Sequence, residues 1–162
     1  MCQTQFQKGI YDRNLNSPEK TINFSGNLWS PQSLDLLETH TEKEKNKKCA
    51  IIDSPYPQKG TQASIEVCKE KKWEFDVIKD PDYASFLDKL SQYSKLVFHP
   101  STPETCCRVI LEAKMMNVEI ETNHLVGASY EEWYSKKGVD LIKYMRKKRE
   151  TFRDFLRPLI HG

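Results

Sequence analysis

The stretch "KLVFHPSTPETCCRVILEAKMMNVEIET", residues 95–122, holds the clearest structural pattern in the chain. Its two ends, 95–99 and 118–122, are short apolar and β-rich runs, which favour buried strands. Between them, residues 104–116 are an apolar run of helical length that follows a turn with two prolines. The stretch therefore predicts a β-α-β unit, in which a helix joins two parallel strands.

The same pattern precedes this unit twice. Short apolar runs predict strands at 49–53 and 73–78, followed by helices at 61–72 and 83–93. Connections of this length suit a parallel sheet with helices on both faces. We therefore predict a Rossmann-like, doubly wound α/β domain whose mostly parallel sheet has four to five strands. Further helices are expected at 30–40, 129–137 and 139–156.

The chain of 162 residues is long enough for one packed core, and we expect a single α/β domain over 31–162. Residues 1–30 form a polar segment in which only 21–24 suggests an extended piece, and no element is assigned there. Hydrophobic residues make up 38% of the chain and charged residues 30%, with a net charge of +2. This balance gives no reason to expect nucleic acid as a partner.

Cysteines, histidines and apolar runs bear on location and cofactors. The five cysteines form no CxxC pair and are odd in number, which favours free thiols in a reducing cytoplasm. The four histidines lack the spacing of metal ligands, so we expect neither a metal nor a cofactor. No apolar run approaches the roughly 18 residues that cross a bilayer, so we expect a cytoplasmic protein. Residues 143–158 have a basic face beside an apolar one, which would also allow peripheral contact with an anionic membrane.

Parallel sheets bind ligands at the carboxyl ends of their strands, so the segment around Glu104 is a candidate site. Pro103 suits the first position of a helix, and the backbone N–H groups of Thr105 and Cys106 would then face the crevice and bind phosphate. Eight helical residues at roughly 1.5 Å each place Glu104 and Glu112 about 12 Å apart, which suits the two hydroxyl-bearing ends of a nucleoside-diphosphate sugar. An ordinary strand-to-helix corner, with Glu104 at the positive end of the helix dipole and Glu112 facing solvent, fits the same residues.

Three segments resemble the donor-binding half of GT-B glycosyltransferases. "PSTPETCCRVILEAKMMNVEIETN", residues 100–123, resembles their E-x7-E motif, which follows a strand end and precedes EA-x-x-x-G and another strand. "DSPYPQKGTQASIE", residues 53–66, is similar to their phosphate-contacting K-G segment. "VIKDPDYASFLDKLSQYSKLVFHPS", residues 77–101, resembles their base-binding loop, helix and next strand. The resemblance covers roughly residues 49–128 in consistent order.

The resemblance implies a metal-independent glycosyltransferase that binds a UDP- or GDP-sugar and transfers the sugar to an acceptor. Glu104 would be the catalytic-site carboxylate on the donor-sugar hydroxyls, and Glu112 would bind the ribose. Lys59, followed by Gly60, would neutralise phosphate charge from a flexible loop. The other implied donor contacts are Ser54, Ile78, Asp80, Thr105 and Cys106.

The chain departs from that family at several points, and Asn117 stands in place of the glycine after the E-x7-E helix. The arginine that commonly precedes the lysine is absent, and Ser54 and Pro55 stand in its place. Residues 1–48 are too few for the acceptor-binding domain of a GT-B enzyme, so the resemblance implies a partner domain or subunit. The alternative is a non-catalytic nucleotide-binding or interaction module of the same fold.

Residues near the expected strand ends bear on two other chemistries. Cys106 near a helix start, with His99 at the adjoining strand end, would suit a cysteine hydrolase, although the adjacent pair Cys106 and Cys107 is more typical of core filling. Asp53 at a strand end resembles the phosphoacceptor of receiver domains. The further acidic residues and the late lysine that those domains need are missing from the expected positions.

Overall fold

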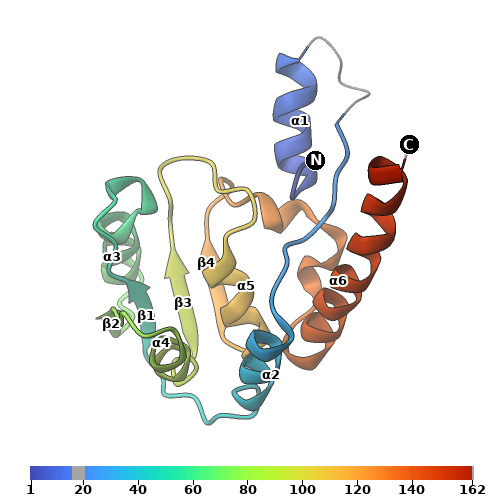
Figure 1. Cartoon of the computed structure of the whole chain (residues 1–162). Helices are drawn as coiled ribbons and strands as arrows, with labels where there is room; N and C mark the ends of the chain where they lie inside the picture. The colour runs from blue at the N-terminus through green and yellow to red at the C-terminus, as the bar shows by residue number, and fades with distance from the viewer. Residues whose placement is uncertain (16–20, 162) are drawn as a thin grey trace.

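Four parallel strands form a sheet in the computed structural model, which describes residues 1–15 and 21–161. Their order across the sheet is β2-β1-β3-β4 (Figure 1). In the register of the central strand, Cys49 lies opposite both Phe75 and Lys95. The predicted doubly wound α/β fold with a parallel sheet is therefore confirmed, with four strands. The strands are β1 (Cys49–Ile52), β2 (Phe75–Ile78), β3 (Lys95–Phe98) and β4 (Glu119–Thr122).

Helices cover both faces of the sheet, as predicted. α3 packs on one face against β1 and β3, whereas α4 and α5 lie on the other face (Figure 1). α2 and α6 pack against α5 and against each other. The chain passes from the edge strand β2 across β1 to β3, so the strand order reverses between β1 and β3, which is where open α/β sheets bind ligands. The helices are α2 (Pro31–Thr39), α3 (Thr61–Glu70), α4 (Tyr83–Leu90), α5 (Arg108–Met115) and α6 (Gly138–His161).

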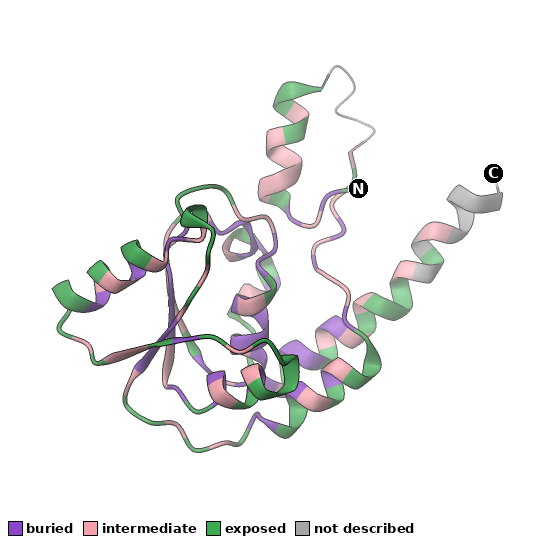
Figure 2. Ribbon diagram, turned by 60° about the vertical axis from the view of Figure 1, so that its left-hand side comes forward, coloured by how far each residue is buried: buried purple, intermediate pink, exposed green. Residues whose placement is uncertain are grey.

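Alternating side chains on the central strands divide the core into two clusters. Leu96 and Phe98 of β3 belong to the larger cluster, together with apolar residues of α2, α4, α5 and α6. Ile51 and Val97 belong to the smaller cluster, which α3 closes with Cys68. Buried residues accordingly concentrate on the strands and on the helix sides that face them (Figure 2).

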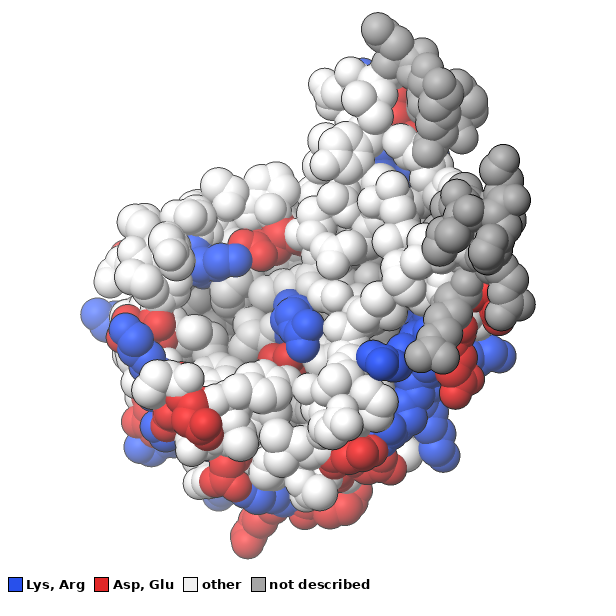
Figure 3. Space-filling model, in the orientation of Figure 1, with Lys and Arg blue, Asp and Glu red and all other residues white. Residues whose placement is uncertain are grey.

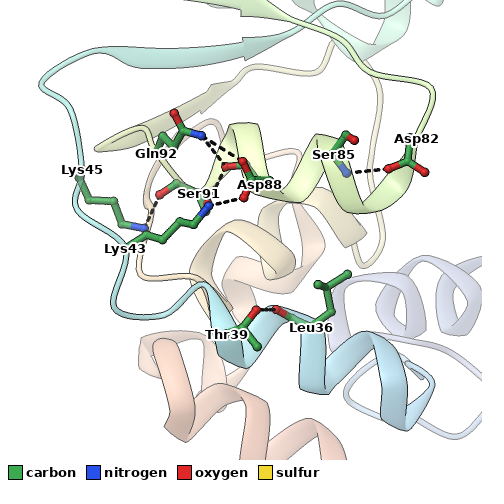
Figure 4. A network of polar contacts seen from close by, with 9 residues as sticks. All are labelled: Leu36, Thr39, Lys43, Lys45, Asp82, Ser85, Asp88, Ser91 and Gln92. Carbon is green, nitrogen blue, oxygen red and sulfur yellow. Dashed lines mark hydrogen bonds and ion pairs between the residues drawn. The ribbon is translucent and has the colours of Figure 1, made fainter.

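The loop between α2 and β1 is tied to the end of α4 (Figure 4). Lys43 pairs with Asp88 on α4. Lys45 Nζ donates to the carbonyl oxygens of Ser91 (2.5 Å) and Met116 (2.7 Å), and burial lowers the pKa of Lys45. These contacts fix the position at which the chain enters the central strand β1.

An additional helix, α1 (Gln5–Asn14), lies in the segment to which no element was assigned. The side-chain oxygen of Thr4 caps it by accepting a hydrogen bond from the N–H of Gln7 (3.2 Å). Phe6 stacks on Tyr130, with 5.5 Å between ring centroids. A ten-residue helix is marginal alone, so contacts of this kind with a distant part of the chain stabilise it. Residues 1–15 and 21–30 thus belong to the folded unit.

The predicted helix at 129–137 is wrong, because this segment forms two short 3-10 helices. Glu131 separates them in an extended conformation, with φ −89° and ψ 140°. Its buried carboxylate accepts hydrogen bonds from the backbone N–H of Gln5 and from the hydroxyl of Ser25. A long-range tether therefore replaces the local helix. The two elements are η3 (Gly127–Tyr130) and η4 (Glu132–Ser135).

Candidate functional site

A pocket of about 450 Å³ opens at the carboxyl ends of β1 and β3, where the strand order reverses. Figure 3 shows a hollow on this side of the molecule, with isolated positive and negative side chains among mostly uncharged surface. The lining comes from both strand ends, the loop after β1, the approach to α5 and the N-terminal segment. The lining residues are Gln3, Asn27, Ile52, Ser54, Lys59, Phe98, Glu104, Thr105, Cys106, Cys107, Arg108 and Val109.

Lys59 and Glu104 form an ion pair in this pocket, with 2.6 Å between Nζ and Oε1. Lys59 ends the 3-10 helix η2 (Pro57–Lys59), and Gly60 then turns the chain into α3 with a left-handed φ of +73°. A Cβ at Gly60 would lie 1.8 Å from the carbonyl oxygen of His99, so the close approach requires glycine. The lysine loop is thereby held against the end of β3, which places Lys59 beside Glu104.

Glu104 lies before the helix, so the predicted helix start at this residue is wrong. Its N–H donates to the carbonyl of Leu125 (2.9 Å), and its carbonyl accepts from the N–H of Gly127 (2.7 Å). Because its backbone is committed to this parallel bridge, the helix begins only at Arg108. Glu104 and Glu112 do not share one helix, and the expected spacing of about 12 Å along a helix axis does not apply.

Thr105 and Cys106 belong to the same segment before the helix and line the pocket. The Thr105 hydroxyl donates to Gln3 Oε1 (2.9 Å), which ties the N-terminal segment to the pocket wall. Cys107 is the N-cap of α5, so the free N–H groups of the first helical turn belong to residues after it, beginning with Arg108. The prediction that Thr105 and Cys106 supply helix-start N–H groups is therefore wrong.

Glu112 is buried on the inner side of α5, and it does not line the pocket. Its Oε1 accepts hydrogen bonds from Trp29 Nε1 (3.0 Å) and from the Tyr83 hydroxyl (2.9 Å), and it lies 3.4 Å from Arg108 Nη2. Burial and the nearby Glu112 charge raise the pKa of Tyr83, so its hydroxyl stays protonated as a donor. The alternative in which Glu112 faces solvent is wrong, because the buried carboxylate joins α5 to α4 and to the segment before α2.

Sequence reasoning misses Arg108, which lines the pocket from the first turn of α5. Its guanidinium carbon lies 4.9 Å from the centroid of the Trp29 ring, and Nη1 donates to the Leu28 carbonyl (3.3 Å). The available signal was its position four residues before Glu112, the spacing of a helical ion pair. The pocket thus has two cationic side chains, Lys59 from the loop and Arg108 from the helix.

The structure separates the residues expected to border a base from the rest of the site. Ile78 is buried at the end of the edge strand β2. Asp80 accepts a hydrogen bond from the N–H of Asp82 (3.0 Å) and pairs with Lys89 (3.2 Å). Neither Ile78 nor Asp80 lines the pocket, whereas Ser54 does.

The thiols beside the pocket are not activated. Burial raises the pKa of Cys106 to about 12 and that of Cys107 to about 11, and a protonated thiol is a poor nucleophile. His99 does not line the pocket, and its Nε2 lies 3.8 Å from Glu121 Oε1. These positions favour core packing for the cysteine pair.

A larger hollow of about 610 Å³ lies between the N-terminal segment, η4 and α6. Its central polar groups already bind one another. Trp133 Nε1 donates to Ser25 Oγ (2.9 Å), and the Ser25 hydroxyl donates to Glu131. These bonds join segments of the chain, so the pocket at β1 and β3 is the better candidate for a ligand.

Within residues 1–15 and 21–161, no group of three or more His, Cys, Asp or Glu side chains is placed to hold a metal ion. In the same part of the chain, no helix has both the length and the apolar character needed to cross a membrane. Comparison with known proteins finds no family model, no curated protein and no solved structure that matches the chain.

Proposed function

We propose that this chain is the donor domain of a GT-B type glycosyltransferase and that its pocket binds the diphosphate and sugar of a nucleotide-sugar. The observation that supports this most is the Lys59–Glu104 pair in a pocket at the strand-order reversal. The ammonium group can bind phosphate oxygens, and the carboxylate can accept hydrogen bonds from sugar hydroxyls. A ligand with an anionic group beside a polyol would use both side chains.

Such a ligand would have to break the ion pair between Lys59 and Glu104. The free energy of that pair is smaller than the free energy gained from the new contacts. The Lys59 side chain is 38% exposed and that of Glu104 is 16% exposed, so solvent screens their attraction. Ion pairs of this kind contribute about 0.2–1 kcal/mol, whereas a hydrogen bond to a charged group contributes about 1.5–3 kcal/mol. Phosphate binding at Lys59, with sugar hydroxyls at Glu104, would therefore replace the pair with a net gain.

Transfer of the sugar also needs a site for the acceptor. Among the described residues that line the pocket, Glu104 is the one acid, and it is assigned to the donor sugar. We therefore place the acceptor and its activating base on a partner domain or subunit. The five free, buried cysteines suit a reducing compartment such as the cytoplasm.

One observation favours the second candidate, a non-catalytic nucleotide-binding module. Gln3 and Asn27 line the pocket, and Gln3 accepts the hydrogen bond from Thr105. The chain's own N-terminal segment thus covers part of the pocket rim, where a partner domain would have to approach the bound donor.

Calorimetric titration with uridine, UDP and UDP-glucose, and with the guanosine series, tests the proposal. Lys59→Ala should weaken binding of the tighter nucleoside diphosphate by about fivefold and leave the nucleoside unchanged, because the hydrogen bond to phosphate replaces the ion pair with Glu104 at a net gain of about 1 kcal/mol. The matched control is Lys69→Ala, at an exposed position on α3, which should change nothing. Equal losses for nucleoside and diphosphate would contradict a phosphate role for Lys59.

Glu104→Gln separates the enzyme from the module. This variant should bind the nucleoside diphosphate at least as well as the original chain, because a negative charge beside the phosphates is removed, but it should bind the nucleotide-sugar less tightly. An enzyme domain should also release sugar slowly from the donor, and Glu104→Gln should abolish that hydrolysis. Donor hydrolysis that Glu104→Gln abolishes would favour the enzyme, whereas donor binding without hydrolysis fits both candidates, because the activating base is placed on a partner.

A further inference from the structure

Arg108 is held at the pocket by a buried framework. Its side chain is 48% exposed and reaches the pocket, whereas Glu112 behind it is only 5% exposed. Trp29 lies against the guanidinium and also donates to Glu112, and Tyr83 donates to the same carboxylate oxygen. Residues from the chain before α2, from α4 and from α5 therefore converge on one arginine.

The framework leaves part of the guanidinium free for a ligand. Nη1 donates to the Leu28 carbonyl and Nη2 to Glu112, and an arginine has five N–H donors in a rigid planar fork. Such a fork matches the oxygens of a phosphate, and its restricted orientation reduces the entropy lost on binding. Arg108 also lies in the first turn of α5, where the helix dipole favours an anion.

We propose that Arg108 binds the ligand's diphosphate together with Lys59, and that Glu112 is a positioning residue that acts through Arg108. This inference rests on the proposed function, and it gives Glu112 a role other than the ribose contact that the resemblance implies. The pyrophosphate would lie between a cation from the loop after β1 and a cation from α5. The same arrangement supplies a second cation although Ser54 and Pro55 occupy the position of an arginine in the lysine loop.

A double-mutant cycle with inorganic pyrophosphate and with the tighter of UDP and GDP tests this. Arg108→Gln should weaken both ligands by about tenfold, as expected for a lost charge-assisted hydrogen bond, and should spare the nucleoside. Glu112→Gln keeps an acceptor oxygen for Trp29 and Tyr83 but removes the charge that holds the guanidinium. As a single substitution it should lower the affinity for pyrophosphate several-fold, and in the Arg108→Gln background it should cause no further loss of affinity.

Two further arginine variants serve as controls for this test. Arg13→Gln makes the same charge change at an exposed position of α1 and should leave affinity unchanged. Arg108→Lys should recover only part of the affinity, because an ammonium lacks the fork. The positioning role is overturned if Glu112→Gln still weakens pyrophosphate binding in the Arg108→Gln background. It is also overturned if Glu112→Gln weakens binding of the nucleoside alone, a result that would support a ribose contact.

The inference can fail separately from the proposed function. If the original chain binds neither pyrophosphate nor the nucleoside diphosphates, the proposed function fails. If Lys59→Ala weakens pyrophosphate binding and Arg108→Gln does not, only the inference about Arg108 and Glu112 fails. Should Glu112→Gln not fold, Trp29→Phe keeps an aromatic ring beside the guanidinium and removes one donor from Glu112. It should then weaken pyrophosphate only when Arg108 is present, and a loss without Arg108 overturns the positioning role.

Discussion

Substitution of Gly60 by alanine should strongly destabilise the fold, because two independent costs meet at this residue. An alanine at φ +73° occupies a left-handed conformation, which costs roughly 1–2 kcal/mol. Its Cβ would also lie 1.8 Å from the carbonyl oxygen of His99 and 3.1 Å from the Cα of Pro100. These are backbone atoms that cannot rotate away, so α3 must shift from the end of β3, at about 1–3 kcal/mol for an overpacked site.

The expected total for Gly60→Ala is about 2–5 kcal/mol in the free energy of unfolding. For a chain of this size, each kcal/mol lowers the melting temperature by about 2–4 °C, so a decrease of at least about 4 °C is expected. Thermal and urea unfolding followed by circular dichroism measure both quantities. Gly9→Ala is the matched control, because its Cβ would meet only Arg13 Nη1 at 3.8 Å inside α1, and it should be neutral or slightly stabilising. A Gly60→Ala melting temperature within about 2 °C of the original chain would refute the close packing of α3 on β3.

Three further predictions follow from buried polar groups. Because burial raises the pKa of Cys106 to about 12 and that of Cys107 to about 11, iodoacetamide at pH 8 should leave both unmodified in the native protein and label them in urea, as mass spectrometry of tryptic peptides would show. Burial lowers the pKa of His40, so the unfolded chain takes up a proton that the native state resists as the pH falls below about 6.5. The free energy of unfolding should thus decrease from pH 7.5 to pH 5.5. His40→Leu should make this pH dependence weaker but not remove it, because the pKa of His99 is lowered too. An unchanged pH dependence in His40→Leu would contradict the role of His40. Glu131→Ala should speed tryptic cleavage within residues 1–15, since Gln5 and Ser25 lose their acceptor, whereas the exposed control Glu132→Ala should not; equal cleavage rates would show that the tether is unimportant.

The sequence was informative wherever a local pattern determines the structure. The apolar runs at 49–53 and 95–99 contain β1 and β3, and Ser30 with Pro31 begins α2 as capping rules predict. The parallel sheet with helices on both faces follows from the same alternation of short strands and helices.

Hydrogen bonds between residues far apart in the chain explain why one helix start and one whole helix were predicted wrongly. The backbone of Glu104 pairs with 125–127, and no pattern near residue 104 reveals this, so the start of α5 was placed four residues too early. Glu131 likewise uses its carboxylate on residues more than a hundred positions away, and the helix expected around it does not form. α1 carried a local signal, because Thr4 followed by Gln7 resembles a capping box.

The sequence predicted only the part of the candidate site that depends on the positions of the strand ends. Lys59 and Glu104 follow neighbouring strands, so the rule that parallel strands bind ligands at their carboxyl ends brings them together. The burial of Glu112 depends on Trp29 and Tyr83, which lie far from it in the sequence, and the helical spacing to Arg108 was the one local indication of this cluster.

NMR spectroscopy can locate the bound diphosphate directly. Backbone amide shifts of the ¹⁵N-labelled chain should be followed during titration with pyrophosphate and with the tighter of UDP and GDP. A diphosphate bound in this pocket should cause saturable changes at Ser54, Lys59, Thr105, Arg108 and Val109 and leave the hollow beside Glu131 unaffected. Changes that do not saturate, or that cluster away from the carboxyl ends of β1 and β3, would contradict a diphosphate site in this pocket.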